Sequence, residues 1–314
     1  MPRILVVGSA NVDFTVALAR LPRPGETVTN GTLLVARGGK GANQAVAARR
    51  LGADVRLIAC VGDDGSGQEI RAALAAEGVG VEGVATTDAA STGTALITVD
   101  PEGRNQIAVA PGANRALTVD WLERRRADFA WAEVVACQCE VPLETVAWSL
   151  AEARRRGATT ILNPAPVPDA MPEVWRDVGY LTPNEGEAAR LAGGAEDPAV
   201  AARALRARGA GAVIVTLGGD GALAVTAAGE IRVPAFRVAV VDTTGAGDAF
   251  NGALAVALAE RRALPDALRL AAAAGALACT RRGAQPSLPR RDEVDRLLAT
   301  DAGRSGGAGG GGDD

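Results

Sequence analysis

The 314-residue sequence contains no histidine and only one lysine, Lys40, so that 32 of its 33 basic residues are arginine. Without histidine, Ser-His-Asp and Cys-His nucleophilic catalysis and every histidine-ligated metal site are excluded. Acid and base chemistry therefore falls to carboxylates, lysine, tyrosine or cysteine. A lone lysine between glycines indicates a position that needs a compact ammonium group, and chance placement is the alternative.

Excess positive charge and long apolar runs are also missing. A formal net charge of −4 argues against sequence-independent binding of nucleic acid, which depends on clustered Lys and Arg. The arginine runs 124–126 and 154–156 stand beside acidic residues in helical patterns, which is typical of a solvated helix face. No segment approaches the ~20 apolar residues of a membrane span, and the first apolar run is too short for a signal peptide. We therefore expect a cytoplasmic protein that binds no membrane.

The few cysteines do not indicate a metal site. Cys137 and Cys139 are two residues apart on a predicted strand, and neither Cys60 nor Cys279 provides a second pair with metal-ligand spacing. We interpret all four as reduced packing residues.

Short β-branched runs alternate with longer Ala/Leu-rich segments, which predicts a doubly wound α/β fold with a mostly parallel sheet flanked by helices. The predicted strands are 3–8, 55–62, 133–138, 159–164, 180–184 and 212–218. The predicted helices are 41–52, 66–77, 143–156, 185–192, 198–208, 248–260, 265–281 and 290–299.

Two strand-rich stretches break this alternation. Residues 12–37 and 92–110 are expected to form a small β-sheet that serves as a lid or as a subunit interface, the second as a hairpin around the turn "DPEG". We expect one α/β domain over residues 1–300, lid included. The Gly-rich segment 301–314 is predicted to be a flexible tail.

The segment "VVDTTGAGDAFNG" at 240–252 is the first candidate site. A Gly-rich turn before a helix would point the amides of Gly245, Ala246 and Gly247 outward at the positive end of the helix dipole, where a phosphoryl group can bind. Asp248 could then accept a proton from an attacking hydroxyl. An Asp before an apolar helical run is usually a helix N-cap, so these residues alone favour capping and leave the catalytic role open.

Further polar residues stand at predicted strand ends and helix starts, where α/β sheets bind ligands. In "GGKGANQ", the loop with Gly39 precedes Lys40 and Asn43, which share one helix face. Asn11 and Asp13 in "GSANVD" lie on one side of an extended segment. Polar turns and loops are the alternative. Other polar residues at such places are Glu140, Asn184 and Glu187.

Taken together, these segments resemble the ribokinase-like family of carbohydrate kinases from residue 4 to about 299. The resemblance is carried by "GGKGANQAVAARRLG" and "DTTGAGDAFNGAL", with "GSANVD", "RPGETV", "CVGDD", "STGTALI", "NPAP", "TPNEGEA", "VTLGGDGA" and "RRGAQPS".

The family resemblance implies a role for each matching residue. Asp248 matches the catalytic base, and Gly245, Ala246 and Gly247 match the anion hole. Asn11, Asp13, Gly39, Lys40, Asn43, Glu140 and Asp248 match positions that hold the sugar. Asn184 and Glu187 match a motif for magnesium and phosphate, and Thr216, Gly218 and Gly221 match the nucleotide loop. The positions of an activating potassium ion match Asp242, Thr244, Ala278, Arg281, Gly283 and Ser287. Ala272 replaces a polar residue near the adenine, which puts that contact in doubt.

The implied activity is ATP-dependent phosphorylation of D-ribose at O5 with Mg²⁺ and K⁺, in a homodimer paired through the β lid. Kinases for deoxyribose, a ketose, 2-keto-3-deoxygluconate or a nucleoside are alternatives of the same class. A non-catalytic sugar- or nucleotide-binding protein is the alternative from another class. The missing G-x-G-x-x-G after the first strand argues against an NAD-dependent dehydrogenase.

Overall fold

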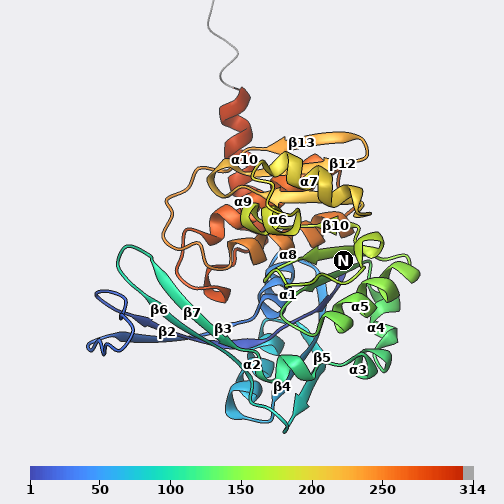
Figure 1. Ribbon diagram of the computed structural model, residues 1–314. Coiled ribbons are helices and arrows are strands. Elements are labelled where there is room, and N and C mark those ends of the chain that lie inside the picture. The colour runs from blue at the N-terminus through green and yellow to red at the C-terminus, as the bar shows by residue number, and fades with distance from the viewer. Residues whose placement is uncertain (307–314) are drawn as a thin grey trace, which may run out of the picture.

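A computed structural model describes residues 1–306, with side chains through Asp301 (Figure 1). The strands of its larger sheet are β1 (Arg3–Val7), β4 (Asp54–Gly62), β5 (Gly80–Thr87), β8 (Val134–Gln138), β9 (Thr159–Asn163), β10 (Tyr180–Leu181), β11 (Ala212–Thr216), β12 (Ala222–Thr226) and β13 (Gly229–Val233). Their order is β13-β12-β11-β10-β9-β8-β1-β4-β5. The seven strands from β11 across to β5 in this order pair in parallel, and β12 and β13 add an antiparallel edge.

Helices cover both faces of this sheet. One face packs against α1 (Lys40–Arg50), α2 (Gly65–Ala76), α8 (Ala246–Ala259), α9 (Leu264–Ala278) and α10 (Arg291–Gly306). The other packs against α3 (Val119–Glu123), α4 (Arg126–Trp131), α5 (Leu143–Arg155), α6 (Glu185–Leu191) and α7 (Pro198–Ala207). Strand β1 is buried on both faces, since Ile4 and Val6 lie in one core and Leu5 and Val7 in the other. Its sequence is therefore continuously apolar.

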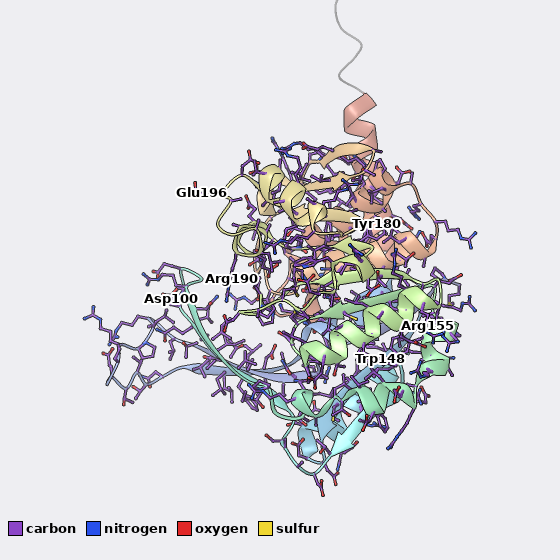
Figure 2. All side chains as sticks on the ribbon, turned by 45° about the vertical axis from the view of Figure 1, so that its right-hand side comes forward. Asp100, Trp148, Arg155, Tyr180, Arg190 and Glu196 are labelled. Atoms are coloured by element: carbon purple, nitrogen blue, oxygen red, sulfur yellow. The ribbon has the colours of Figure 1, made fainter. Side chains whose placement is uncertain are left out.

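The second sheet contains β2 (Asn11–Ala17), β3 (Thr32–Gly38), β6 (Gly93–Val99) and β7 (Asn105–Ala110) in the order β3-β2-β6-β7. It extends away from the main body (Figure 1). Figure 2 shows Asp100, in its β6–β7 turn, far from Tyr180 in the larger sheet. The predicted hairpin is confirmed, since β6 and β7 pair antiparallel.

The predicted core strands and helices are present within a few residues of their expected ends, apart from the strand predicted over 180–184, which contains only Tyr180 and Leu181. Strands β5, β12 and β13 and helices α3 and α4 were not predicted. Helix α10 continues to Gly306, past the expected end of the domain at 300, and the rest of the predicted tail lies outside the described residues.

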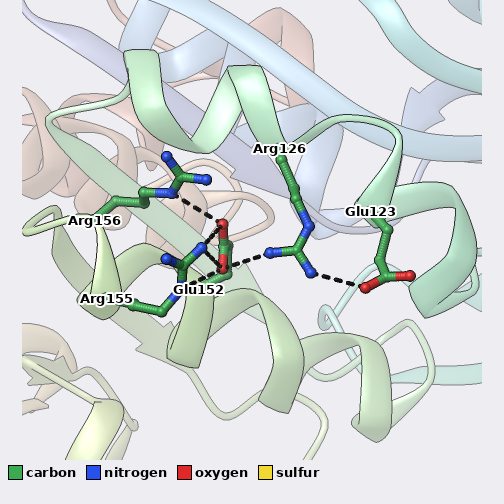
Figure 3. A network of polar contacts seen from close by, with 5 residues as sticks. All are labelled: Glu123, Arg126, Glu152, Arg155 and Arg156. Atoms are coloured by element: carbon green, nitrogen blue, oxygen red, sulfur yellow. Dashed lines mark hydrogen bonds and ion pairs between the residues drawn. The ribbon is translucent and has the colours of Figure 1, made fainter.

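The arginine runs form ion pairs on the surface. Figure 3 shows Glu152 bound by Arg126, Arg155 and Arg156, with Arg126 also paired to Glu123. The buried carboxylate of Glu152 thereby joins α4 to α5. These contacts fit the predicted solvated helix face.

Within the described residues, the four cysteines are free thiols, as expected. None of the helices there is both long and apolar enough to cross a bilayer.

Candidate active site

The candidate site lies beyond the carboxyl end of β1, where the connections of the large sheet change direction. Strand β4 pairs on one side of β1 and β8 on the other. This is the switch point at which open α/β sheets bind ligands, because the two diverging connections leave a crevice. The chain after β1 contributes Asn11 and Asp13 from β2, and the chain after β8 contributes Glu140.

Helix α1 begins in this crevice. Its N-cap Gly39 has φ of +86°, and a Cβ there would lie 2.8 Å from both the Ala10 Cα and the Asn11 nitrogen, so only glycine fits. Glu140 Oε2 accepts the Lys40 backbone N–H at 3.0 Å and also the Ser9 hydroxyl. A carboxylate from the end of β8 thus satisfies an otherwise free amide at the positive end of α1.

Helix α8 places Asp248 opposite α1. Interpreting Asp248 as an N-cap is wrong: the N-cap is Gly245, with φ of +79°, and Asp248 is the third residue of the helix. Its Oδ2 accepts from Asn43 Nδ2 at 2.8 Å, and its Oδ1 accepts from Gln44 Nε2 at 3.2 Å. The carboxylate is therefore directed toward α1 rather than back onto the amides of its own first turn.

A second glycine allows α1 and α8 to approach this closely. A Cβ on Gly252 would lie 2.6 Å from Ala47 Cβ and 3.0 Å from the Gln44 carbonyl oxygen. Gly252 is one helical turn after Asp248, and Ala47 is one turn after Asn43, so this contact sets the separation of the two polar faces.

The turn before α8 leaves amides available for an anion. The Ala246 N–H donates to the Thr243 carbonyl at 3.2 Å, so it is partly occupied. Within residues 1–306 the N–H groups of Gly245 and Gly247 have no acceptor. Two free amides thus stand at the positive end of a 14-residue helix, in the turn that leads to Asp248.

Asp248 is 7% exposed, and burial raises its pKa above the ordinary value. The Lys40 ammonium and the donors of Asn43 and Gln44 act in the opposite direction, whereas Glu140 adds to the rise. The site thus contains a carboxylate of increased basicity that is still supported as an anion.

Four carboxylates surround Lys40. Burial acts to lower its pKa, but Asp248, Glu140, Glu187 and Asp13 together raise it above the ordinary value. Burial, with Glu140 and Asp248, raises the pKa of Asp13 to about 6. The only lysine of the chain is therefore the cation that balances this acidic site, where burial makes charge balance necessary.

Two asparagines of the candidate site leave opposite ends of their side-chain amides without a protein partner. Asn11 Oδ1 accepts from Asn114 Nδ2 at 2.7 Å, which leaves the Asn11 N–H groups free to donate. Asn43 uses its Nδ2 on Asp248, and its Oδ1 is buried without a partner in the described structure. An unpaired buried acceptor is costly unless a ligand hydroxyl satisfies it.

The predicted nucleotide residues form a second group at the carboxyl ends of β10 and β11. Asn184 and Glu187 close a capping box at the start of α6, each side chain accepting from the other's backbone N–H at 2.8 Å. Thr216 pairs with Asn184 in a parallel bridge. Gly218 and Gly221 follow in a short turn, both with positive φ. Glu187 interacts with Lys40 and so links this group to the first.

The residues predicted for potassium are only partly brought together. Asp242 accepts from the Thr244 N–H at 2.9 Å and the Gly283 N–H at 2.8 Å, which ties the turn before α8 to the loop after α9. The side chain of Arg281 instead pairs with Glu293, and the Ser287 hydroxyl donates to the Ala284 carbonyl at 2.8 Å. The Ala278 carbonyl accepts the Arg281 N–H at 3.4 Å, and Ala272 packs against the apolar core.

A hollow of about 540 Å³ lies at the opposite, amino-terminal edge of the sheet, lined among others by Thr159, Tyr180 and Gly211. It contains none of the predicted site residues, and Arg154 is its only charged lining residue. In residues 1–301, no group of three or more His, Cys, Asp or Glu is arranged to hold a metal ion.

Sequence reasoning missed the residues that orient the site. Gln44, Gln138, Asn114 and Asn163 are all buried and hydrogen-bonded around Asp248 or Asn11. The available signal was position, because Gln44 follows Asn43 in the glycine-rich motif and Gln138 and Asn163 end strands.

Known proteins resemble this chain over nearly its whole length. A ribokinase from Haemophilus influenzae is 38% identical over 300 residues, covering 94% of this chain and 98% of the relative. A deoxyribokinase from Salmonella typhi is 35% identical over 306 residues, covering 94% and 98%. The solved structure of Arabidopsis thaliana ribokinase with ribose and ATP is 33% identical, covers 95% of this chain and 98% of that one, and superposes with a TM-score of 0.86.

The family model described as pfkB family carbohydrate kinase matches residues 1–291. This match includes both glycine-rich motifs, the two helix starts that they form and the small β-sheet. The chain therefore belongs to the pfkB family of carbohydrate kinases.

Proposed function

We propose that this protein transfers the γ-phosphoryl group of ATP to O5 of D-ribose, giving D-ribose 5-phosphate and ADP. The observation that carries the proposal is the buried Asp248 carboxylate, held at 2.8 Å by Asn43 beside the free amides of Gly245 and Gly247. A base beside an anion-binding helix start is the arrangement that phosphoryl transfer to a hydroxyl requires. The ribokinase relatives support ribose as the acceptor.

In the reaction, Asp248 accepts the proton of the sugar O5 hydroxyl. The bond from O5 to the γ-phosphorus forms, and the bond from that phosphorus to the oxygen of the leaving ADP breaks. The amides of Gly245 and Gly247, with Ala246 between them, stabilise negative charge on the transferred group. The raised pKa of Asp248 makes it a stronger base than an exposed carboxylate.

The sugar is bound by groups of both polarities. Asn11 offers N–H donors, whereas Asn43 Oδ1 and the carboxylates of Asp13 and Glu140 accept from sugar hydroxyls. Lys40 balances these carboxylates and donates to a sugar oxygen. Gly39 would contribute by letting the start of α1 lie against the backbone of Ala10 and Asn11, because a Cβ there would be 2.8 Å from both.

The nucleotide is proposed to lie along β10 and β11, against Thr216, Gly218 and Gly221. Asn184 and Glu187 would hold Mg²⁺ together with the ATP phosphates, and bound Mg²⁺ would neutralise phosphate charge. One carboxylate, that of Glu187, suits this choice, because Mg²⁺ is commonly held by one or two carboxylates together with substrate phosphates.

K⁺ is proposed as an activator beside the anion hole. Oxygen donors suit an alkali cation, and Asp242 with Thr244 provides them where two loops meet. Bound K⁺ would stabilise the turn that carries the amides. The further positions proposed to contribute, mostly through backbone carbonyls, are Ala278, Arg281, Gly283 and Ser287.

A homodimer through the small sheet is also proposed. In residues 1–301, Leu33, Val35 and Leu96 are each more than half exposed. The strand pairing aligns Val35 and Leu96 with Phe14 on the sheet face opposite Asp13. Leu34, Ile107 and Val109, which are also more than half exposed, lie on the Asp13 face, so both faces of the sheet carry apolar surface whose burial against a second copy is favourable. The cytoplasmic location stays a prediction.

ADP release should be measured with D-ribose, 2-deoxyribose, ketoses, 2-keto-3-deoxygluconate and nucleosides, with and without K⁺. We expect the highest kcat/KM with D-ribose. A higher value with 2-deoxyribose would favour the alternative represented by the deoxyribokinase relative. Tight sugar binding without ADP release would favour the non-catalytic alternative.

A further inference from the structure

A chain of buried amides runs from the end of β8 to Asp248. Gln138 Nε2 donates to Gln44 Oε1 at 2.7 Å, and Gln44 Nε2 donates to Asp248 Oδ1 at 3.2 Å. Gln138 is 0% exposed and Gln44 is 1% exposed, and both ends of the Gln44 amide already have protein partners. We propose that Gln44 and Gln138 are positioning residues that hold the Asp248 carboxylate in its reactive orientation. The inference rests on the proposed role of Asp248 as base.

A backbone carbonyl decides which end of each of these side-chain amides donates and which accepts. The Thr182 carbonyl can only accept, so Asn163 turns its Nδ2 toward it at 3.0 Å and presents its Oδ1 to Gln44. Gln44 Nε2 lies 3.3 Å from this Oδ1 and must be the donor there. The Gln44 carbonyl end then faces Gln138, which donates to it. Asn163 and Gln44 therefore each have one orientation that satisfies their neighbours, and Gln138 must donate to Gln44 even though its own Oε1 is left buried without a partner in the described structure.

This polarity directs an N–H group, rather than a carbonyl, at Asp248. Asn43 donates to Oδ2 and Gln44 to Oδ1, so the plane of the carboxylate is held from both oxygens. Asn43 keeps an Oδ1 without a protein partner, whereas both ends of the Gln44 amide are engaged by Asn163, Gln138 and Asp248. The Gln44 contact can thus orient the base without occupying the position of the sugar.

Other charged groups face Asp248 as well. Lys40 on α1 favours the carboxylate anion, and Glu140 after β8 and Asp13 on β2 oppose it. Because these groups remain in a Gln44 variant, loss of the Gln44 donor should shift the balance toward protonated Asp248. The acid limb of the pH profile should then move to higher pH.

The first test is Gln44→Met, which keeps the side-chain length and removes the amide. We expect kcat to fall about 10- to 100-fold, as for a misplaced reacting group. The KM for D-ribose should stay within about threefold, and the acid limb of kcat should move up by roughly one pH unit. A folded variant with a kcat–pH profile identical to that of the parent protein would overturn the proposal.

Gln138→Met tests whether Gln138 acts through Gln44. Its kcat should fall less than that of Gln44→Met, with the acid limb displaced in the same direction. In the double variant, Gln138→Met should add no further loss, since the contact it supports is already gone. If the losses in kcat of the two single variants add fully in the double variant, Gln138 does not act through Gln44. If Gln44→Met does not fold, the pH profile of Gln138→Met decides the question.

Thr145→Val is a matched control. It removes a buried hydroxyl that donates to the Leu117 carbonyl at 2.6 Å, on the other side of the large sheet. It should lower stability without moving the pH profile. Asp248→Asn separates the two proposals: if it keeps normal turnover, the assigned base is wrong, and if it is inactive while Gln44→Met is normal, only the positioning role fails.

Discussion

The Nδ2 of Asn43 lies 2.8 Å from the Oδ2 of Asp248, although 205 positions separate the two residues in the chain. The contact joins the starts of α1 and α8. Each helix begins in a glycine-rich turn, so the free amides at the start of α8 lie next to a carboxylate that Asn43 at the start of α1 holds.

Asp248→Asn should lower kcat by roughly 10²–10⁴, the range for loss of a general base. The KM for D-ribose should change little, because the amide keeps the size of the carboxylate. Since burial disfavours the charged form, the variant should be at least as stable as the parent protein. Steady-state kinetics and thermal unfolding at pH 7.5 test this, and near-normal turnover would contradict it.

Asp13→Asn should make the ligand-free protein more stable at pH 8 but not at pH 4. The pKa of Asp13 is about 6 in the folded protein and about 3.8 as its ordinary value. The stability that goes with a raised carboxyl pKa is fully present below pH 3.8 and is lost as pH rises through 6. The gain at pH 8 is up to about 3 kcal/mol, measured by urea unfolding at both pH values.

The same variant should bind D-ribose less tightly at pH 8, because a carboxylate accepts sugar hydroxyls more strongly than an amide. In the parent protein, the KM for D-ribose should rise as pH falls below about 6, where Asp13 becomes protonated. A KM that is constant from pH 5 to pH 8 would remove Asp13 from the sugar site.

Gly252→Ala should push α1 away from α8. Its Cβ would lie 2.6 Å from Ala47 Cβ, a separation that real contacts do not reach. We expect a loss of about 1–3 kcal/mol in unfolding free energy and a lower kcat, because Asn43 moves away from Asp248. Gly65→Ala is the control, since a Cβ at Gly65 meets nothing within 4 Å. Equal effects of the two substitutions would argue against this account.

Asp242→Ala should loosen the turn before α8. The substitution removes the acceptor for Thr244 and Gly283, which join two loops. We expect kcat/KM for ATP to fall roughly 10- to 100-fold because the anion-binding amides lose their fixed position. The K⁺ concentration needed for half-maximal activity should rise. If the ATP kinetics and the K⁺ response are the same as those of the parent protein, this turn contributes neither to ATP use nor to activation by K⁺.

The sequence predicted the elements that have strong local signals. Continuous apolar runs such as β1 and long Ala/Leu-rich segments such as α8 were located within a few residues, because burial on two faces requires such composition. The edge strands β12 and β13 were missed. Their pairing depends on neighbours in the sheet and not on a pattern within each strand.

The sequence by itself determined the fold class and the family, and it predicted that glycine-rich helix starts and strand ends would form the site, since these are local features. Only the tertiary structure decided that Gly245, and not Asp248, begins α8, and that Asn43 and Gln44 hold the carboxylate. It also decided the donor and acceptor ends of Gln44, through Asn163 and the Thr182 carbonyl. Such contacts join residues far apart in the chain, so their geometry depends on how sheet and helices pack.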